Sequence, residues 1–378
     1  MANIVILGSG FAGYTAVKRL RKHGCTDTIT VISPQAALFY YPSLIWVPQG
    51  RRREADLHVA LTGFFRRNAV RHIATRVTAL DPVQQRVHTE IGETPYDYLI
   101  IASGGRYLRT LPGIEHAHIA CEGWQAVKRF SDRLAGLNGG NLVFGFAGNA
   151  QEPPAMRGGP IFEFMFGVDT LLRDQGRRAN FHLTFISTAP KPGVRMGNKA
   201  VEGILREVDR RGIQRHFGHR LVGIEADQVL TDGGAVPSDL TLFIPALTGP
   251  DWAPASGLPL SAGGFIQADA QTRVPGFPGI YVAGDAGSFP GPEWKPKQAH
   301  MADQQARCAV SNLLALKAGK PQTHTFKTRL ICIVDNGKTG TLVYRDPQRG
   351  FASAMPPWHW LKLALEWQYL RTYRRYLA

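Results

Sequence analysis

Short apolar runs rich in β-branched residues alternate along this chain with stretches of helical composition. The first run, Ile4–Leu7, ends at a glycine, and helical composition follows from Tyr14 to His23. A second run, Thr28–Ser33, comes after it. Runs without polar alternation are typical of strands that are buried on both faces of a parallel sheet. Their alternation with helices predicts the α/β fold class.

The alternation continues over most of the chain. The pattern predicts further buried strands at 96–105, 141–148, 180–186, 240–244 and 280–283, and helices that end near 175, 211 and 316. Residues 77–87 and 221–231 read as pairs of short antiparallel strands, and Asn336-Gly337 predicts a hairpin turn. The aromatic stretch 38–52 contains two prolines and predicts an irregular segment.

Glycines follow the first strand with the spacing G-x-G-x-x-G. Gly8 would permit the tight turn, Gly10 would let a pyrophosphate approach the backbone, and Gly13 would let the helix pack closely on the strand. The helix start then offers unpaired N–H groups and the positive end of a dipole to the phosphates. An acidic residue often ends the second strand and binds ribose, but Ser33 stands there. The motif predicts a dinucleotide site without naming the dinucleotide.

The segment G-I-Y-V-A-G-D, residues 279–285, is the second informative motif. A strand ends there in Gly284-Asp285, at the sheet edge where ligands bind. The carboxylate can accept hydrogen bonds from polyol hydroxyls, which points to the ribityl chain of FAD. The strand at 96–105 ends in Ser-Gly-Gly and should pass near the same dinucleotide, and the aromatic stretch offers a wall for a planar ring.

The strand at 141–148 opens a second unit with Gly145 and Gly148, but Pro153 and Pro154 follow shortly afterwards. Consecutive prolines cannot continue a helix that needs their N–H groups. A phosphate-binding helix start is therefore not built in the usual way, and the sequence disfavours a nicotinamide site.

Composition narrows the partners. The chain has 378 residues, 44% of them hydrophobic, which is enough for two α/β domains. A formal charge of +15 favours an acidic partner, but without a nucleic-acid-binding motif we expect no nucleic-acid function. The four cysteines form no C-x-x-C pair, so we expect no metal site. Neither a signal peptide nor a spanning segment is recognisable, which favours a location on the cytoplasmic side.

The tail from Pro357 to Tyr376 is rich in Trp and Tyr and carries Lys362, Arg371, Arg374 and Arg375. Trp360, Leu361, Ala364, Leu365, Tyr369 and Tyr373 recur at helical spacing. The pattern predicts a basic amphipathic helix that lies on an anionic membrane surface. The alternatives are a helix docked on the protein's own core and a dimer contact.

Taken together, several segments resemble the sulfide:quinone oxidoreductase family. They are G-S-G-F-A-G, F-Y-Y-P-S-L-I-W-V-P-Q-G-R-R, I-A-C-E-G-W, R-G-G-P-I-F-E-F, G-I-Y-V-A-G-D, P-K-Q-A-H-M-A, I-C-I-V-D-N-G and the aromatic basic tail. The resemblance spans essentially the whole chain. Type II NADH:quinone dehydrogenases and flavocytochrome sulfide dehydrogenases are more distant relatives.

The resemblance implies two Rossmann-like domains of the glutathione-reductase type and a C-terminal region that binds membrane and quinone. The expected boundaries are 1–112 with 246–320 for the FAD domain, 113–245 for the second domain and 321–378 for the C-terminal region. A homo-oligomer is possible. The residues expected at FAD are Gly8, Gly10, Phe11, Ala12, Gly13, Ser33, Pro42, Ser43, Ala102, Gly104, Gly284, Asp285 and Lys297.

In the family two cysteines flank the flavin and carry sulfur. Cys332 matches one of them and Cys121 matches an accessory cysteine, but Met156 and Arg157 stand where the other should be. Arg157 is either an anion-binding group beside the flavin or a surface residue. Lys297 and His300 are candidates to assist quinone protonation. Glu163 is a weaker candidate, because a helix-surface glutamate is the simpler interpretation.

Three functions stay open at this point. The first is a membrane-peripheral FAD enzyme that passes electrons from sulfide, or a related reduced sulfur donor, to quinone. The second is a quinone reductase fed by NADH, which the broken second fingerprint disfavours. The third is a flavoprotein subunit without sulfide chemistry that relays electrons or docks a partner.

Overall fold

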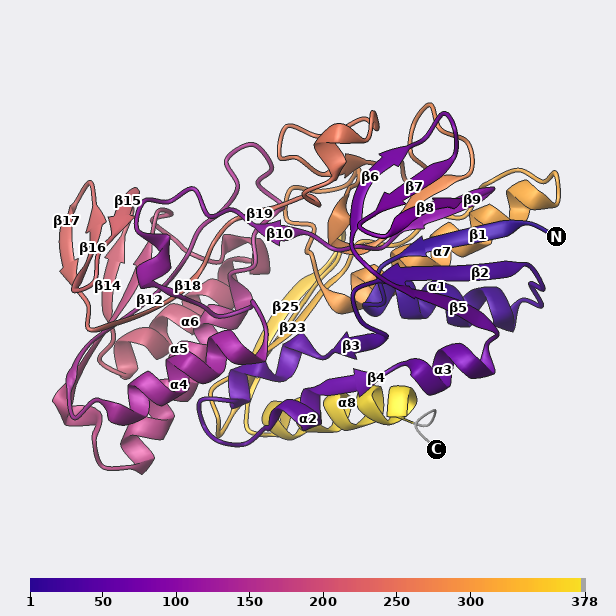
Figure 1. The fold of residues 1–378 in the computed structure, drawn as a ribbon. Helices are drawn as coiled ribbons and strands as arrows, with labels where there is room; N and C mark the ends of the chain where they lie inside the picture. Colours follow the sequence, from indigo (N-terminus) through magenta and orange to yellow (C-terminus); the bar gives the residue numbers. More distant parts are fainter. Residues whose placement is uncertain (375–378) are drawn as a thin grey trace.

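The computed structural model describes residues 1–374 and contains two five-stranded parallel sheets (Figure 1). The first has the order β21-β9-β1-β2-β5 and the second the order β11-β18-β12-β13-β14. The first sheet consists of β1 (Asn3–Leu7), β2 (Thr28–Ser33), β5 (Val70–Ala74), β9 (Tyr98–Ile101) and β21 (Ile280–Val282). The second consists of β11 (His118–Ile119), β12 (Gly140–Phe146), β13 (Phe181–Ser187), β14 (Gln214–Phe217) and β18 (Leu240–Ile244).

Helices cover these sheets, as the alternation predicts. Helix α1 (Phe11–Lys22) packs along α7 (Ala299–Lys317) beside the first sheet, and α5 (Gly159–Asp174) packs on the second. The remaining helices are α2 (Glu54–Leu57), α3 (Thr62–Arg67), α4 (Trp124–Gly136), α6 (Asn198–Arg210) and α8 (Pro357–Arg374).

Both halves of the chain insert an antiparallel meander before one strand of their parallel sheet. Strands β6 (Val77–Asp81), β7 (Arg86–Thr89) and β8 (Gly92–Pro95) precede β9, and β15 (Leu221–Ile224), β16 (Gln228–Thr231) and β17 (Gly234–Pro237) precede β18. A third meander, β23 (Leu330–Asp335), β24 (Gly340–Arg345) and β25 (Gly350–Met355), leads into α8. Short pairings are made by β3 (Ala37–Phe39) with β4 (His58–Ala60), β10 (Arg106–Tyr107) with β19 (Leu247–Thr248), and β20 (Ile266–Gln267) with β22 (Gly287–Ser288).

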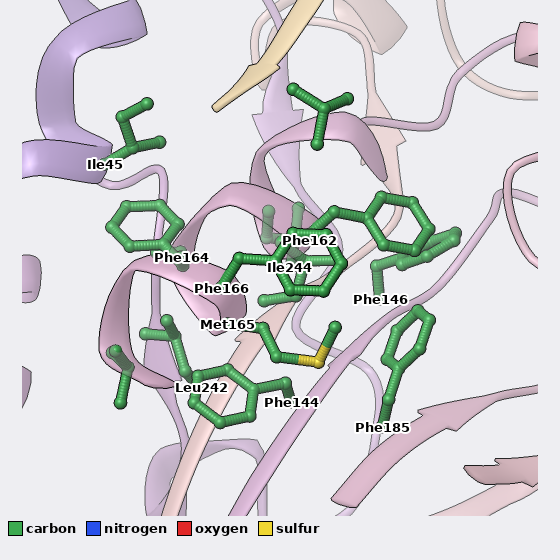
Figure 2. Packing of buried hydrophobic residues seen from close by; sticks show 14 of the residues in the cluster. Ile45, Phe144, Phe146, Phe162, Phe164, Met165, Phe166, Phe185, Leu242 and Ile244 are labelled. Atoms are coloured by element: carbon green, nitrogen blue, oxygen red, sulfur yellow. The ribbon is translucent and has the colours of Figure 1, made fainter. Parts of the chain in front are cut away.

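Helix α5 lies at the centre of the larger core. Its Phe162 and Met165 are buried toward Phe185 of β13 and Phe144 of β12, whereas Phe164 faces Ile45, as Figure 2 shows. Such a helix, apolar on nearly every side, is typical of a buried position. Because α5 is fixed on all sides, the residues at its N-terminal end are held in place for the site described below.

Most elements predicted from the pattern are confirmed, including the two meander pairs and the hairpin at Asn336-Gly337. The aromatic stretch was expected to be irregular, but Tyr41–Trp46 form the 3₁₀ helix η1, and β25 was not foreseen. The tail is helical through Arg374, and Arg375 and Tyr376 lie outside the described residues. Within the part of the chain that the structure describes, no helix is long and apolar enough to cross a membrane. The domain boundaries stay a prediction.

Candidate functional site

A cavity of about 560 Å³ opens at the carboxyl edge of the first sheet. It is lined by the ends of β1, β2 and β9, so that Gly8, Ser33 and Gly104 face one space. Parallel α/β sheets bind ligands at this edge, because the strand ends and the loops that follow them converge there. The structure therefore brings three of the predicted cofactor residues together.

The three fingerprint glycines differ in what surrounds them. A Cβ on Gly13 would lie 2.0 Å from the Gly8 carbonyl oxygen, and one on Gly8, whose φ is +102°, would lie 2.4 Å from the Ala102 oxygen. A Cβ on Gly10 would meet no atom within 4 Å. Two glycines thus permit close packing, while Gly10 borders open space. Helix α1 begins beside it with no side-chain cap, so its first N–H groups remain available to a phosphate.

Other residues of this cavity were not foreseen. Thr75 and Arg76 follow β5. Glu90 lies between β7 and β8 of the first meander, and Trp252 lies in the loop after β19. The sequence carries no motif for them, because only the sheet order places β5 beside β2. The Ser33 hydroxyl lies 2.8 Å from the Gln35 carbonyl oxygen, to which it donates, and 3.0 Å from His72 Nε2.

The Gly284-Asp285 motif lies against helix α1, which follows the G-x-G-x-x-G motif. A Cβ on Gly284, whose φ is +79°, would lie 3.6 Å from the Ala12 Cβ, and the Gly284 N–H donates to Gln305 of α7. Asp285 and Lys297 line a second cavity with Gly284. Residues almost 300 positions apart in sequence are therefore neighbours here.

Lys297 is half-buried beside this cavity. Its ammonium group donates to the backbone oxygens of Asp285, at 3.1 Å, and Gly287, at 2.9 Å, and lies 3.8 Å from the ring centre of Phe265. Burial lowers the pKa of Lys297 to about 8, against the opposing effect of Asp285. A lysine of this kind can exchange a proton near neutral pH.

Arg157 does not lie on an open surface loop. Its guanidinium forms an ion pair with the Asp285 carboxylate and donates to the Tyr107 hydroxyl at 3.3 Å. The Arg157 side chain is 24% exposed. Burial lowers its pKa, but Asp285 and then Tyr107 and Cys121 outweigh that effect and raise the pKa overall.

The two cysteines of interest lie near the N-terminal end of α5. Cys121 is buried; burial raises its pKa, while Arg157 and a hydrogen bond with Tyr107 oppose the rise. Cys332 on β23 faces Gly159, where a Cβ would lie 3.9 Å from its sulfur, and burial raises its pKa to about 12. Cys25 and Cys308 are buried elsewhere.

Glu163 was interpreted as a surface residue, and that interpretation is wrong. Its carboxylate is 5% exposed, pairs with Lys362 of α8, and accepts the Asp335 N–H at 2.9 Å. Burial raises the pKa of Glu163 to about 7, although Lys362 opposes the shift. His359 Nδ1 lies 2.6 Å from the Asp335 carboxylate, which extends the buried cluster. The periodicity of α5 could not reveal this, because the partners come from β23 and α8.

Three further predicted residues, His300, Ser43 and Pro42, line neither of the two cavities. His300 Nε2 lies 2.9 Å from the Arg329 carbonyl oxygen, and burial lowers the pKa of this imidazole. Ser43 is buried in η1, whereas Pro42 beside it is exposed. None of these contacts brings the three side chains into either cavity.

The loop after β12 is hydrogen-bonded to three positions between residues 247 and 288. The Asn149 amide donates to the Leu247 and Gly263 oxygens at 2.9 and 3.3 Å, and Ser288 donates to the Glu152 carboxylate at 2.6 Å. A Cβ on Gly263 would lie 2.2 Å from the Glu152 Cβ. In this conformation the loop leaves little room between itself and Gly263.

The inner face of helix α8 carries paired polar side chains together with the buried Leu370 and Tyr373, and several large apolar side chains face outward. Inward, Lys362 meets Glu163, Glu366 pairs with Arg52, and the Tyr369 hydroxyl donates to Asp303. Tyr373 is also buried, with its ring 4.3 Å from that of Tyr14. The expectation that Tyr369 and Tyr373 share the outward face is therefore wrong. The large hydrophobic residues exposed on the helix are Trp360, Leu361, Leu365 and Trp367.

Comparison with known proteins gives a consistent fold. The crystal structure of the sulfide:quinone oxidoreductase from Aquifex aeolicus superposes with a TM-score of 0.89 and 23% identity, covering 100% of this chain and 92% of that chain. The type II NADH:quinone oxidoreductase Ndh of Mycobacterium tuberculosis is 24% identical over 355 residues, covering 84% of this chain and 73% of that protein. The ferredoxin–NAD(+) reductase component of the biphenyl dioxygenase system of Paraburkholderia xenovorans is 23% identical over 368 residues, covering 92% and 85%.

The family model for pyridine nucleotide-disulphide oxidoreductases matches residues 2–306. Proteins of this family bind FAD. The open space at Gly10, the uncapped start of α1 and the large cavity at the sheet edge fit the pyrophosphate and adenosine half of that cofactor. The chain therefore belongs to the FAD-dependent pyridine nucleotide-disulphide oxidoreductase family.

Proposed function

We propose that this protein is a membrane-peripheral enzyme that passes electrons from sulfide, or a related small reduced sulfur species, through FAD to a quinone. The observation that carries the proposal is the buried Glu163–Lys362 pair near Cys332, under the helix with the apolar outer face. Reducing a quinone takes two electrons and two protons, so a proton-exchanging group between a thiol and an apolar surface suits it. FAD, when bound, supplies the two-electron relay between donor and quinone.

The residues have separate roles in this proposal. Gly8, Gly10, Gly13 and Gly104 hold the pyrophosphate and adenosine half of FAD. Asp285 and Lys297 lie toward the half that carries the flavin ring. Glu163 holds a proton on its carboxyl group near pH 7, and Lys362 stabilises the carboxylate after the proton leaves. Cys332 and Cys121 are the thiols available to sulfur.

The outer face of α8 supports attachment to a membrane surface. Trp360 is 68% exposed and Trp367 is 61% exposed, and the Arg371 guanidinium lies 4.9 Å from the ring centre of Trp367. Tryptophan and arginine together are typical of helices that lie at an anionic lipid interface. The inner face of α8 is docked on the rest of the protein, so the alternative of a helix docked on the protein's own core holds for that face.

A second function, reduction of quinone by NADH, is favoured by the type II NADH:quinone oxidoreductase among the relatives. Against it stands the fastened loop after β12, which carries Pro153 and Pro154 and delays the start of α5 to Gly159, so the helix does not follow the strand directly as it does after β1. The third possibility, a relay subunit without sulfide chemistry, is favoured by the absence of a cysteine at position 157.

Anaerobic reduction of the purified FAD-loaded protein distinguishes these functions. We expect sulfide to bleach the flavin absorbance and a ubiquinone analogue to restore it, whereas NADH acts slowly. Bleaching by NADH alone would favour the second function. Bleaching by neither donor, with no turnover of quinone, would leave the relay subunit.

A further inference from the structure

Arg157 stands at the place where the sequence departs from the family pattern, and it is positioned between separate segments. The loop before α5 supplies it, β10 supplies Tyr107, the segment after β11 supplies Cys121, and the end of β21 leads to Asp285. Tyr41 of η1 also lies within electrostatic range of Arg157 and Cys121. Residues from four other segments thus lie around one guanidinium group.

The guanidinium is only partly used by these neighbours. It has five N–H donors. Among the described residues, one nitrogen donates to Asp285 and another to Tyr107. The side chain is 24% exposed, so it is not sealed off from a small molecule. A planar group with parallel donors suits an oxyanion or another small anion.

The neighbours fit an anion better than a neutral ligand. Asp285 is the single carboxylate that contacts Arg157 among the described residues, and the Lys297 ammonium lies against the backbone oxygen of Asp285. Tyr107 and Cys121 are protonated at neutral pH, because burial raises the pKa of both. They hydrogen-bond to each other, and neither places a negative charge beside Arg157.

We propose that Arg157, Tyr107 and Cys121 form a binding site for a small sulfur anion of the hydrosulfide or thiosulfate type. A positive charge then holds the donor where related enzymes use a second cysteine, and the anion lies beside the Cys121 thiol. The sulfur identity of the anion rests on the proposed function, whereas the existence of the anion site rests on the geometry alone.

The test uses oxidised FAD-loaded protein without quinone and thiosulfate as the probe, with chloride at equal ionic strength as reference. Two quantities are measured: the rate at which iodoacetamide alkylates Cys121, followed by mass spectrometry, and the melting temperature. We expect thiosulfate to slow alkylation of Cys121 but not of Cys332, and to raise the melting temperature. The melting-temperature measurement does not require a reactive thiol.

Variants assign the effect to the site. Arg157→Gln removes charge-assisted hydrogen bonds, so the thiosulfate concentration for half-maximal effect should rise about tenfold or more. Arg157→Lys should keep part of the effect, and Tyr107→Phe should weaken it. Arg206→Gln, an exposed change of the same charge on α6, is the matched control and should behave like the parent protein.

Thiosulfate effects that are absent, or equal in the parent and Arg157→Gln, would overturn the site and leave the Arg157–Asp285 pair as a structural link. If sulfide fails to bleach the flavin while Arg157-dependent thiosulfate binding persists, the sulfide donor is refuted and the anion site stands. If sulfide bleaches the flavin but thiosulfate binding does not depend on Arg157, the anion site is refuted and the sulfide donor stands.

Discussion

Replacing Glu163 by glutamine should make the protein more stable at alkaline pH. Two effects oppose each other at this carboxyl group: burial favours its protonated form, and Lys362 favours its charged form. Burial is the larger effect and raises the pKa from an ordinary value near 4.5 to about 7. Glutamine resembles the protonated group, so the variant removes the titration and keeps the shape.

The sign follows from proton binding. Between these two pKa values the folded protein holds a proton at Glu163 that the unfolded chain has already lost. The stability contributed by this group is therefore complete below about pH 4.5 and is lost as the pH rises through 7. For one group with this shift, linkage gives a loss of about 2.5 kcal/mol between about pH 5 and pH 8.

Equilibrium urea unfolding at several pH values, at a fixed excess of FAD, measures the effect. The difference in unfolding free energy between Glu163→Gln and the parent should grow in favour of the variant by about 2.5 kcal/mol from about pH 5 to pH 8. Glu202→Gln, an exposed change on α6, should show a difference that does not vary with pH. If Glu163→Gln instead loses stability relative to the parent as the pH rises, the Lys362 ion pair outweighs burial and the reasoning is refuted.

Two further predictions use pairs of variants. Gly10→Ala should lower FAD affinity in equilibrium dialysis while leaving the apoprotein's stability within about 0.5 kcal/mol, because its Cβ meets no protein atom. Gly13→Ala should instead destabilise the protein by several kcal/mol, because its Cβ would lie 2.0 Å from the Gly8 oxygen. Equal effects of the two variants on affinity and melting temperature would contradict this. Trp360→Ser with Trp367→Ser should weaken sedimentation with anionic liposomes at an unchanged melting temperature, whereas Tyr373→Ser should cost about 3–5 kcal/mol because its ring is buried; unchanged liposome binding by the double variant would show that another surface makes the contact.

The sequence predicted most of the parallel sheets because their strands are continuous apolar runs, and it predicted the two glycine motifs because each needs particular backbone geometry. It did not predict Arg76 at the first cavity or the partner of Arg157. The first depends on β5 lying beside β2, and the second on a contact between distant segments of the chain. Asp285 was identified by its own motif, but no local pattern indicates that an arginine 128 positions earlier pairs with it.

Helix α8 shows the same limit most clearly. Its spacing predicts two faces, and the ordinary rule assigns the apolar face to the interior. Here Lys362, Glu366 and Tyr369 lie inward, because Glu163, Arg52 and Asp303 come from three other elements and satisfy each of them. Burial of a charge is unfavourable unless such a partner is supplied. With the polar face used inside, Trp360, Leu365 and Trp367 remain outside. The apolar residues left outside are thus a consequence of the buried pairs, and removing the charge of Arg52, which would leave the buried Glu366 without its partner, should disturb the docking of the helix.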